Sequence, residues 1–194
     1  MKRHFHATRL QQGVGMIELM VAILISAFGL LGYVGLQARS TALELEAYQR
    51  SQALVLLQDI VSRINANRGH VGDYASESLF GSGSQETCAA LTGSQLDLCE
   101  WANLLRGNAE IRSGNRIGAM TGARGCIRLA AGTSDRLLIS IAWQGLSSTA
   151  GATNDCGKGD SFPDESLRRA VSASVCVALL RDPAAGVVLA KPRC

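Results

Sequence analysis

The chain has 194 residues and a formal net charge of +3, enough for one ordinary domain and an appendage. Three basic residues, Lys2, Arg3 and Arg9, precede Gly13, and no acidic residue does; the remaining 16 basic residues equal the 16 acidic ones. A body without net charge gives no general reason to expect binding to a polyanion such as nucleic acid.

An apolar run extends from Val14 to Leu36, and Glu18 is its only charged residue. The run is long enough to cross a bilayer, which takes about 20 apolar residues. The basic flank before it predicts a cytoplasmic N-terminus, so the chain after Leu36 is expected on the far side of the membrane. A carboxylate inside a spanning helix is costly, which makes Glu18 a candidate functional residue.

Two ordinary interpretations of this run compete with a functional one. A cleaved secretory signal fits poorly, because its apolar region spans only about 7–15 residues and an A-x-A cleavage site follows it. A plain single-pass anchor accounts for the run and its basic flank, but it leaves Glu18 unexplained.

The helix is expected to continue beyond the membrane in amphipathic form. From Gln37 to Ile64 apolar residues recur at helical spacing on one face, while polar and charged residues occupy the other. No proline interrupts this segment, and asparagine and glycine follow it as stop signals. A helix from Val14 to about Asn65 would be roughly 75 Å long, and the apolar stripe of its second half requires a partner.

The rest of the chain predicts a small mixed domain. Residues 69–88 are rich in Gly, Ser and polar residues, which predicts a loop. A short helix is expected at 94–106, where Leu98, Trp101 and Leu105 share a face and Trp101 serves packing. Strands are expected in "CIRLAA", "RLLISIAW", "RRAVSASVCVALL" and "GVVLAK". An antiparallel sheet of such strands, laid on the helical stripe, gives an α+β fold.

The second half of the chain holds six cysteines, and their even number predicts disulfides and an oxidising compartment. They are Cys88, Cys99, Cys126, Cys156, Cys176 and Cys194. No C-x-x-C pair is present, and His70 is the only histidine after the first six residues, so no metal site is expected. Six cysteines allow about 15 connectivities.

Signals of other chemistry are weak. The sequence contains no G-x-S-x-G, no H-E-x-x-H and no glycine-rich phosphate loop that opens a helix, so neither catalysis nor a cofactor is expected. The acidic loop "NDCGKGDSFPDE" lacks the spacing of a calcium loop and is interpreted as solvated. Five arginines lie between Arg106 and Arg128, but the neutral body favours a solvated face over nucleic-acid binding.

The start of the chain resembles the class III signal of type IV prepilins. That signal places a glycine after a short leader, then Phe-Thr-Leu-x-Glu and an unbroken apolar run. Here Gly13 is followed by "VGMIE", with valine and glycine in place of phenylalanine and threonine. The resemblance implies that a prepilin peptidase cuts between Gly13 and Val14 and methylates the new amino terminus at Val14.

Further segments resemble the PilV-type minor pilins, or type IV pilus modification proteins. These segments are "RINANRG", "RGCIRL", "IAWQGL", "DCGKG" and "LRRAVSASV", which keep the same order. The resemblance implies a pilin fold: a leader at 1–13, a long helix at 14–68 with its transmembrane part at 14–36, and a globular domain at 69–194 with an αβ-loop and an antiparallel sheet.

The resemblance also implies a function. A minor pilin helps to initiate assembly of the type IV pilus and supports motility and adhesion. Its expected partners are other minor and major pilins, the prepilin peptidase, the inner-membrane assembly machinery and a tip adhesin. Before assembly it would span the inner membrane with a periplasmic C-terminus. Glu18 would keep subunits in register by pairing with a neighbour's Val14 amine, although an intrachain pair can compete.

A local disulfide pairing is expected alongside this resemblance. One bridge would close a short loop, the second would clip the start of a strand to the loop after its neighbour, and the third would tie the C-terminus to the last long strand, as pilins often do. The three pairs are Cys88–Cys99, Cys126–Cys156 and Cys176–Cys194.

Two other functions remain open at this point. A minor pseudopilin of a type II secretion system would have the same signal, helix and sheet. A single-pass membrane protein with an extracytoplasmic binding domain would keep its leader and never enter a filament.

Overall fold

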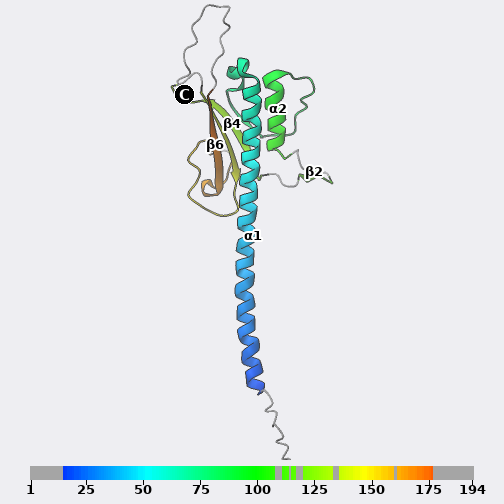
Figure 1. The fold of residues 1–194 in the computed structure, drawn as a ribbon, viewed down its shortest axis with the longest axis vertical. Helices are drawn as coiled ribbons and strands as arrows, with labels where there is room; N and C mark the ends of the chain where they lie inside the picture. Colours follow the sequence, from blue (N-terminus) through cyan, green and yellow to red (C-terminus); the bar gives the residue numbers. More distant parts are fainter. Residues whose placement is uncertain are drawn as a thin grey trace, which may run out of the picture. The chain divides into compact units, whose positions relative to one another are not determined.

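A computed structural model describes residues 15–107, 111–113, 115–116, 120–132, 136–159 and 161–176 (Figure 1). One helix, α1, spans Met16–Ala66. The chain divides into two compact units, of which the first ends at Leu43 and the second begins at Glu44. The first unit therefore contains the apolar half of α1, and the second contains its amphipathic half with the remaining elements.

The second unit contains two short 3-10 helices, one further α-helix and six strands in its described part. In chain order they are η1 (Arg68–Tyr74), β1 (Ser76–Phe80), α2 (Gly93–Leu105), β2 (Ile111–Arg112), β3 (Asn115–Arg116), β4 (Arg124–Leu129), β5 (Arg136–Gln144), η2 (Glu165–Leu167) and β6 (Arg168–Cys176).

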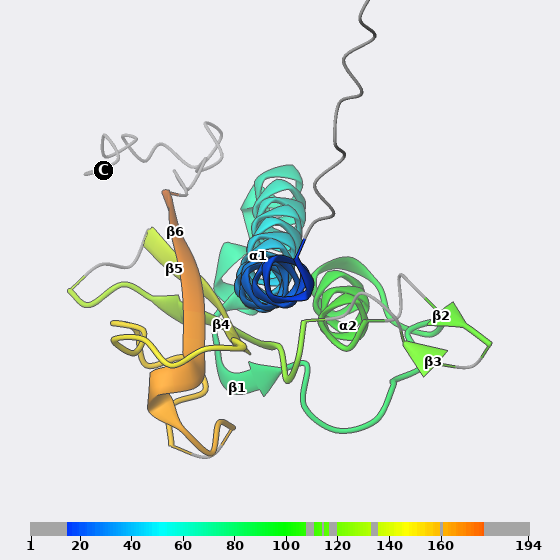
Figure 2. The ribbon, with the colours of Figure 1, turned by 90° about the horizontal axis from the view of Figure 1, so that it is seen from below.

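Four strands form one antiparallel sheet in the order β1-β4-β5-β6 (Figure 2). In β5 every second residue is fully buried at Leu137, Ile139 and Ile141, and this face of the sheet lies towards α1. Ile139 pairs with Ile127 of β4 and with Ala173 of β6, so the register brings apolar residues of three strands together. The strands β2 and β3 form a separate hairpin.

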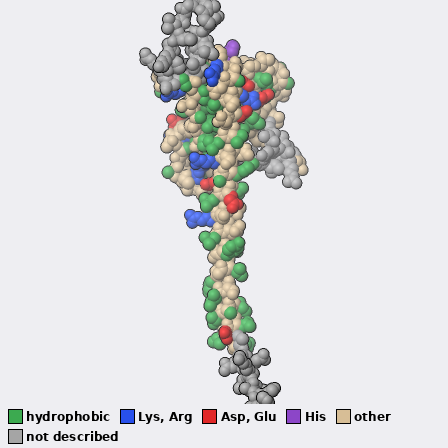
Figure 3. Space-filling view, viewed as in Figure 1, with side chains coloured by type: hydrophobic (Ala, Val, Ile, Leu, Met, Phe, Trp, Pro, Cys, Tyr) green, Lys and Arg blue, Asp and Glu red, His purple; other side chains and the backbone are tan. Residues whose placement is uncertain are grey.

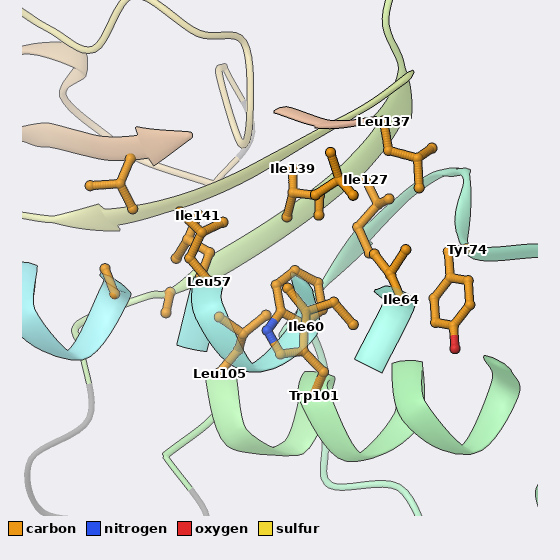
Figure 4. Close-up of a cluster of buried hydrophobic side chains, with 14 of the residues drawn as sticks. Leu57, Ile60, Ile64, Tyr74, Trp101, Leu105, Ile127, Leu137, Ile139 and Ile141 are labelled. Carbon is orange, nitrogen blue, oxygen red and sulfur yellow. The ribbon is translucent and has the colours of Figure 1, made fainter. Parts of the chain in front are cut away.

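The core lies where α1 passes between the sheet and α2 (Figure 4). The stripe of α1 is Ala53, Leu57, Ile60 and Ile64, and all four are buried. On the α2 side, Trp101 is 0% exposed, and its indole Nε1–H donates to the Leu56 carbonyl of α1 at 3.0 Å. The tryptophan thus fills space and satisfies its one polar group, as buried tryptophans usually do.

A polar network joins α1, η1 and α2 beside this core. Arg63 of α1 lies 2.9 Å from Asp59, 2.6 Å from Glu100 and 3.3 Å from Asp97. The Tyr74 hydroxyl of η1 donates to Asp97 and accepts from the Asn67 side chain. Burial, reinforced by the bond to Asp97, raises the pKa of Tyr74 from 10.0 to about 12.

The outer strand β1 is short and irregular. Its pairing with β4 shifts register between Ser76 and Phe80. The Ser76 hydroxyl accepts from the Ser78 amide at 3.0 Å, and the Ser82 hydroxyl donates to the Leu79 carbonyl at 3.0 Å. Backbone groups in and next to this strand therefore bond to nearby hydroxyls.

The expected disulfide-stapled α+β fold, a long apolar helix followed by an antiparallel sheet, is confirmed. The predicted loop at 69–88 is wrong in part, because η1 and β1 lie within it. Tyr74 is fully buried there, so tertiary packing overrides the polar composition of the segment. The expected strand at 186–191 lies outside the described residues.

Gly125 of β4 is predicted to be intolerant of any side chain. A Cβ at this position would lie 2.3 Å from Trp101 Cη2 and 2.7 Å from Leu105 Cδ1. We expect Gly125→Ala to lower the free energy of unfolding by about 1–3 kcal/mol, because the core must shift to admit the methyl group. Chemical denaturation of the detergent-solubilised protein measures this. Gly72→Ala is the matched control, since a Cβ there meets nothing within 4 Å; equal stability of the two variants would contradict the packing.

Tyr74 is predicted to stabilise the protein in a pH-dependent way. Its pKa is raised on folding, so its contribution is present in full below pH 10.0 and is lost as pH rises towards about 12. Tyr74→Phe should therefore be less stable than the parent at pH 8, and the difference should narrow above pH 10.0. Ultraviolet titration should show a late-ionising phase in the parent that is absent from Tyr74→Phe. Persistence of the whole late phase in Tyr74→Phe would contradict the assignment.

Candidate functional site

The first half of α1 exposes apolar side chains at positions all around the helix, and Figure 3 shows those on one face. Every large apolar side chain from Met16 to Leu36 is exposed, from 85% at Met16 to 48% at Val21. Among the described residues, α1 is the one helix long and apolar enough to cross a membrane. A surface of this kind needs a bilayer or other apolar helices around it.

Glu18 is the single charged residue on this surface, and it is exposed in the first turn of α1. Its amide donates to the Gly15 carbonyl at 2.9 Å, which places the residue where helical bonding begins. A carboxylate at a helix N-terminus is favoured by the helix dipole. Gly13 and Val14, the expected cleavage and methylation positions, lie outside the described residues.

Two disulfides with both cysteines among the described residues fasten the globular part. Cys88–Cys99 ties the loop before α2 to that helix, with the Cα atoms 5.8 Å apart. Cys126–Cys156 ties β4 to the loop between β5 and β6, also with 5.8 Å between Cα atoms. Cys176 at the end of β6 is disulfide-bonded as well, and its expected partner Cys194 lies outside the described residues.

Arg168 organises the loop between β5 and β6. Its side chain is only 2% exposed and lies 2.6 Å from the Glu165 carboxylate. The same guanidinium donates to the carbonyls of Ala152, Asn154 and Cys156. A buried guanidinium saturated by carbonyls and one carboxylate is well compensated, so this arginine holds the disulfide-linked loop on the sheet.

The candidate calcium loop and the candidate arginine patch are largely engaged by internal partners. Asp155 lies 3.4 Å from Lys158, and no group of three possible metal ligands occurs in the described part of the chain. Arg106 donates to the Ser82 carbonyl and lies 3.1 Å from Glu86. Arg124 donates to the carbonyls of Gly81 and Ala123. The side chains of 112 and 116 lie outside the described residues.

Glu46 forms a contact that the sequence did not reveal. Its Oε1 accepts from the amides of Leu146 at 3.1 Å and Ser147 at 3.0 Å, from the Ser147 hydroxyl at 2.8 Å and from Arg169 Nη2 at 3.3 Å. Glu46 lies beyond the apolar run, and the Ser147 hydroxyl bond is the main cause that lowers the pKa of this carboxyl. Its partners are 100 to 123 residues away, so no local motif could have indicated them.

Two family models match the chain. The prokaryotic N-terminal methylation motif matches residues 8–34, which include the expected cleavage position and Glu18. The model for the type IV pilin Tt1218 and similar proteins matches residues 35–104, from the end of the apolar run through most of α2.

Searches beyond these family models return nothing. No curated protein matches the chain. No solved structure matches it either.

The two family matches adjoin each other, and they agree with an apolar helix that is followed by an antiparallel sheet. The type IV pilins are structural proteins that act by packing. The chain is therefore similar to the type IV pilins over residues 35–104, and it matches the N-terminal methylation motif of prepilins over residues 8–34.

Proposed function

We propose that the chain is a minor pilin of the type IV pilus, of the PilV type. A prepilin peptidase would cut after Gly13 and methylate Val14, and the mature subunit would help to initiate filaments that serve motility and adhesion. The observation that carries the proposal is the methylation motif at 8–34, continued by a helix whose apolar surface bears one carboxylate.

The same observations support a location and a set of partners. Before assembly, the apolar half of α1 would hold the subunit in the inner membrane, with the globular part in the periplasm, where its disulfides can form. In the pilus, the same apolar surface would pack against the helices of other pilins. The assembly machinery and a tip adhesin are the further partners of this proposal.

The proposed mechanism is electrostatic. Cleavage creates an amine at Val14, and such amines titrate at about 7.7–8.0, so it is cationic at neutral pH and methylation keeps the charge. An incoming subunit in the bilayer carries the unpaired Glu18 carboxylate. Pairing with the amine of a neighbouring subunit neutralises both groups in a medium of low dielectric, where an isolated charge is expensive. Apolar helices could slide along one another, but this pair favours one axial position.

Glu18 is predicted to be required for incorporation into filaments but not for membrane insertion. We expect Glu18→Ala and the near-isosteric Glu18→Gln to be inserted and cleaved normally. Both should fall at least about tenfold in sheared filaments, because an unpaired buried charge costs about 3–5 kcal/mol. Quantitative immunoblots of membranes and sheared filaments measure this. Glu77→Gln is the control, since that carboxylate is 92% exposed on β1; normal incorporation of both Glu18 variants would refute the mechanism.

Processing is predicted to remove the first thirteen residues. Intact-mass analysis of sheared filaments should find a species that begins at methylated Val14. The same species confined to membranes would favour the alternative, a minor pseudopilin of a type II secretion system. A form that retains Met1 would contradict both proposals and favour a single-pass membrane protein with an extracytoplasmic binding domain.

A further inference from the structure

The turn after β5 directs several hydrogen-bond donors to one point. Two are consecutive backbone amides, those of Leu146 and Ser147, and the third is the Ser147 hydroxyl. The fourth is the guanidinium of Arg169 at the start of β6. Arg169 also donates to the carbonyls of Ser147 and Ser166, so the turn itself fixes the guanidinium.

A site made of donors selects an anionic acceptor. Successive amides and a guanidinium form a concavity suited to an oxyanion, and hydrogen bonds to an ionised acceptor are stronger than neutral ones. The position is taken by one carboxylate oxygen, Glu46 Oε1, with contacts between 2.8 and 3.3 Å. The Glu46 side chain is 22% exposed, and that of Arg169 is 17% exposed, so water is partly excluded from the pair.

We infer that residues 146–147 and Arg169 form a carboxylate-binding site that works as a releasable clasp on α1. With Glu46 seated, the helix is docked on the turn after β5; with Glu46 neutral or absent, this part of the helix separates from the turn while the core stays folded. The clasp is a feature of the second compact unit alone.

The position of Glu46 along α1 explains why the clasp matters. Ala53 is the first residue of α1 that is fully buried by the core. Ala53 lies seven positions after Glu46, which corresponds to roughly 10 Å of helix at 1.5 Å per residue. The residues between them are exposed or only partly buried. Release of Glu46 would therefore free about two turns of helix beyond the core.

Protonation is the natural trigger for release. Arg169 is the charged group that faces Glu46 from the sheet, and Arg50 lies four residues after Glu46 on α1 itself. The side chain that the turn after β5 contributes is the Ser147 hydroxyl, which does not titrate in this range. The donors lower the pKa of Glu46 below its ordinary 4.5. The stabilisation that the bound Glu46 carboxylate contributes is thus present above pH 4.5. It is lost as the pH falls through the lower pKa that Glu46 has in the folded state.

Amide hydrogen exchange and proton–proton NOEs on the full chain in detergent micelles test the clasp. The variant is Glu46→Gln, and the matched control is Glu77→Gln. At pH 7 we expect Glu46→Gln to lose the NOEs between side chain 46 and the amides of Leu146 and Ser147. The protection factors of these two amides should fall about tenfold, as for the loss of one charge-assisted bond. The parent should show the same changes when it is acidified well below pH 4.5, the ordinary pKa of this carboxyl.

The amide of Ile139 in the core is the internal reference and should keep its protection throughout. Unchanged NOEs and protection in Glu46→Gln would overturn the proposal. Loss of protection at Ile139 together with the turn would overturn it too, because Glu46 would then support the whole unit rather than a local clasp. A parent turn that does not respond to acid would remove the proposed trigger.

Discussion

The burial of one stripe of α1 is the contact on which the second compact unit depends. Ala53, Leu57, Ile60 and Ile64 have the sheet on one side and α2 on the other, so neither the sheet nor α2 has its own complete core. At the edge of this stripe, Arg63 forms ion pairs with neighbouring carboxylates. The amphipathic half of the helix is therefore the central layer of the domain. Its apolar half requires a bilayer or other apolar helices around it.

Sequence periodicity predicted the elements that bury a regular face. The face of α2 around Trp101 and the alternation at Leu137, Ile139 and Ile141 have the period of their structure and are found. The α1 stripe is found only in part: Leu57, Ile60 and Ile64 are buried, whereas Leu54 and Val55, which also have helical spacing, are exposed. β1 was missed because its five residues show no alternation of burial. Its place in the sheet is determined by pairing with β4, which a local pattern does not report.

The candidate site was predictable only where it depends on sequence order. Glu18 and its apolar surroundings are local features, and they can be recognised from the chain alone. Arg168 and Glu46 could not be assigned, because a solvated charge and a buried charge have the same sequence signature. The role of Arg168 depends on the loop carbonyls that surround it. The role of Glu46 depends on backbone amides of a turn that is distant in sequence.

The irregular strand β1 has a consequence for association between molecules. An outer strand normally offers a row of free amides and carbonyls on which a foreign strand can grow. Here the strand is five residues long, it slips in register, and serine hydroxyls occupy the Ser78 amide and the Leu79 carbonyl. This margin of the sheet is therefore a poor template for amyloid-like stacking.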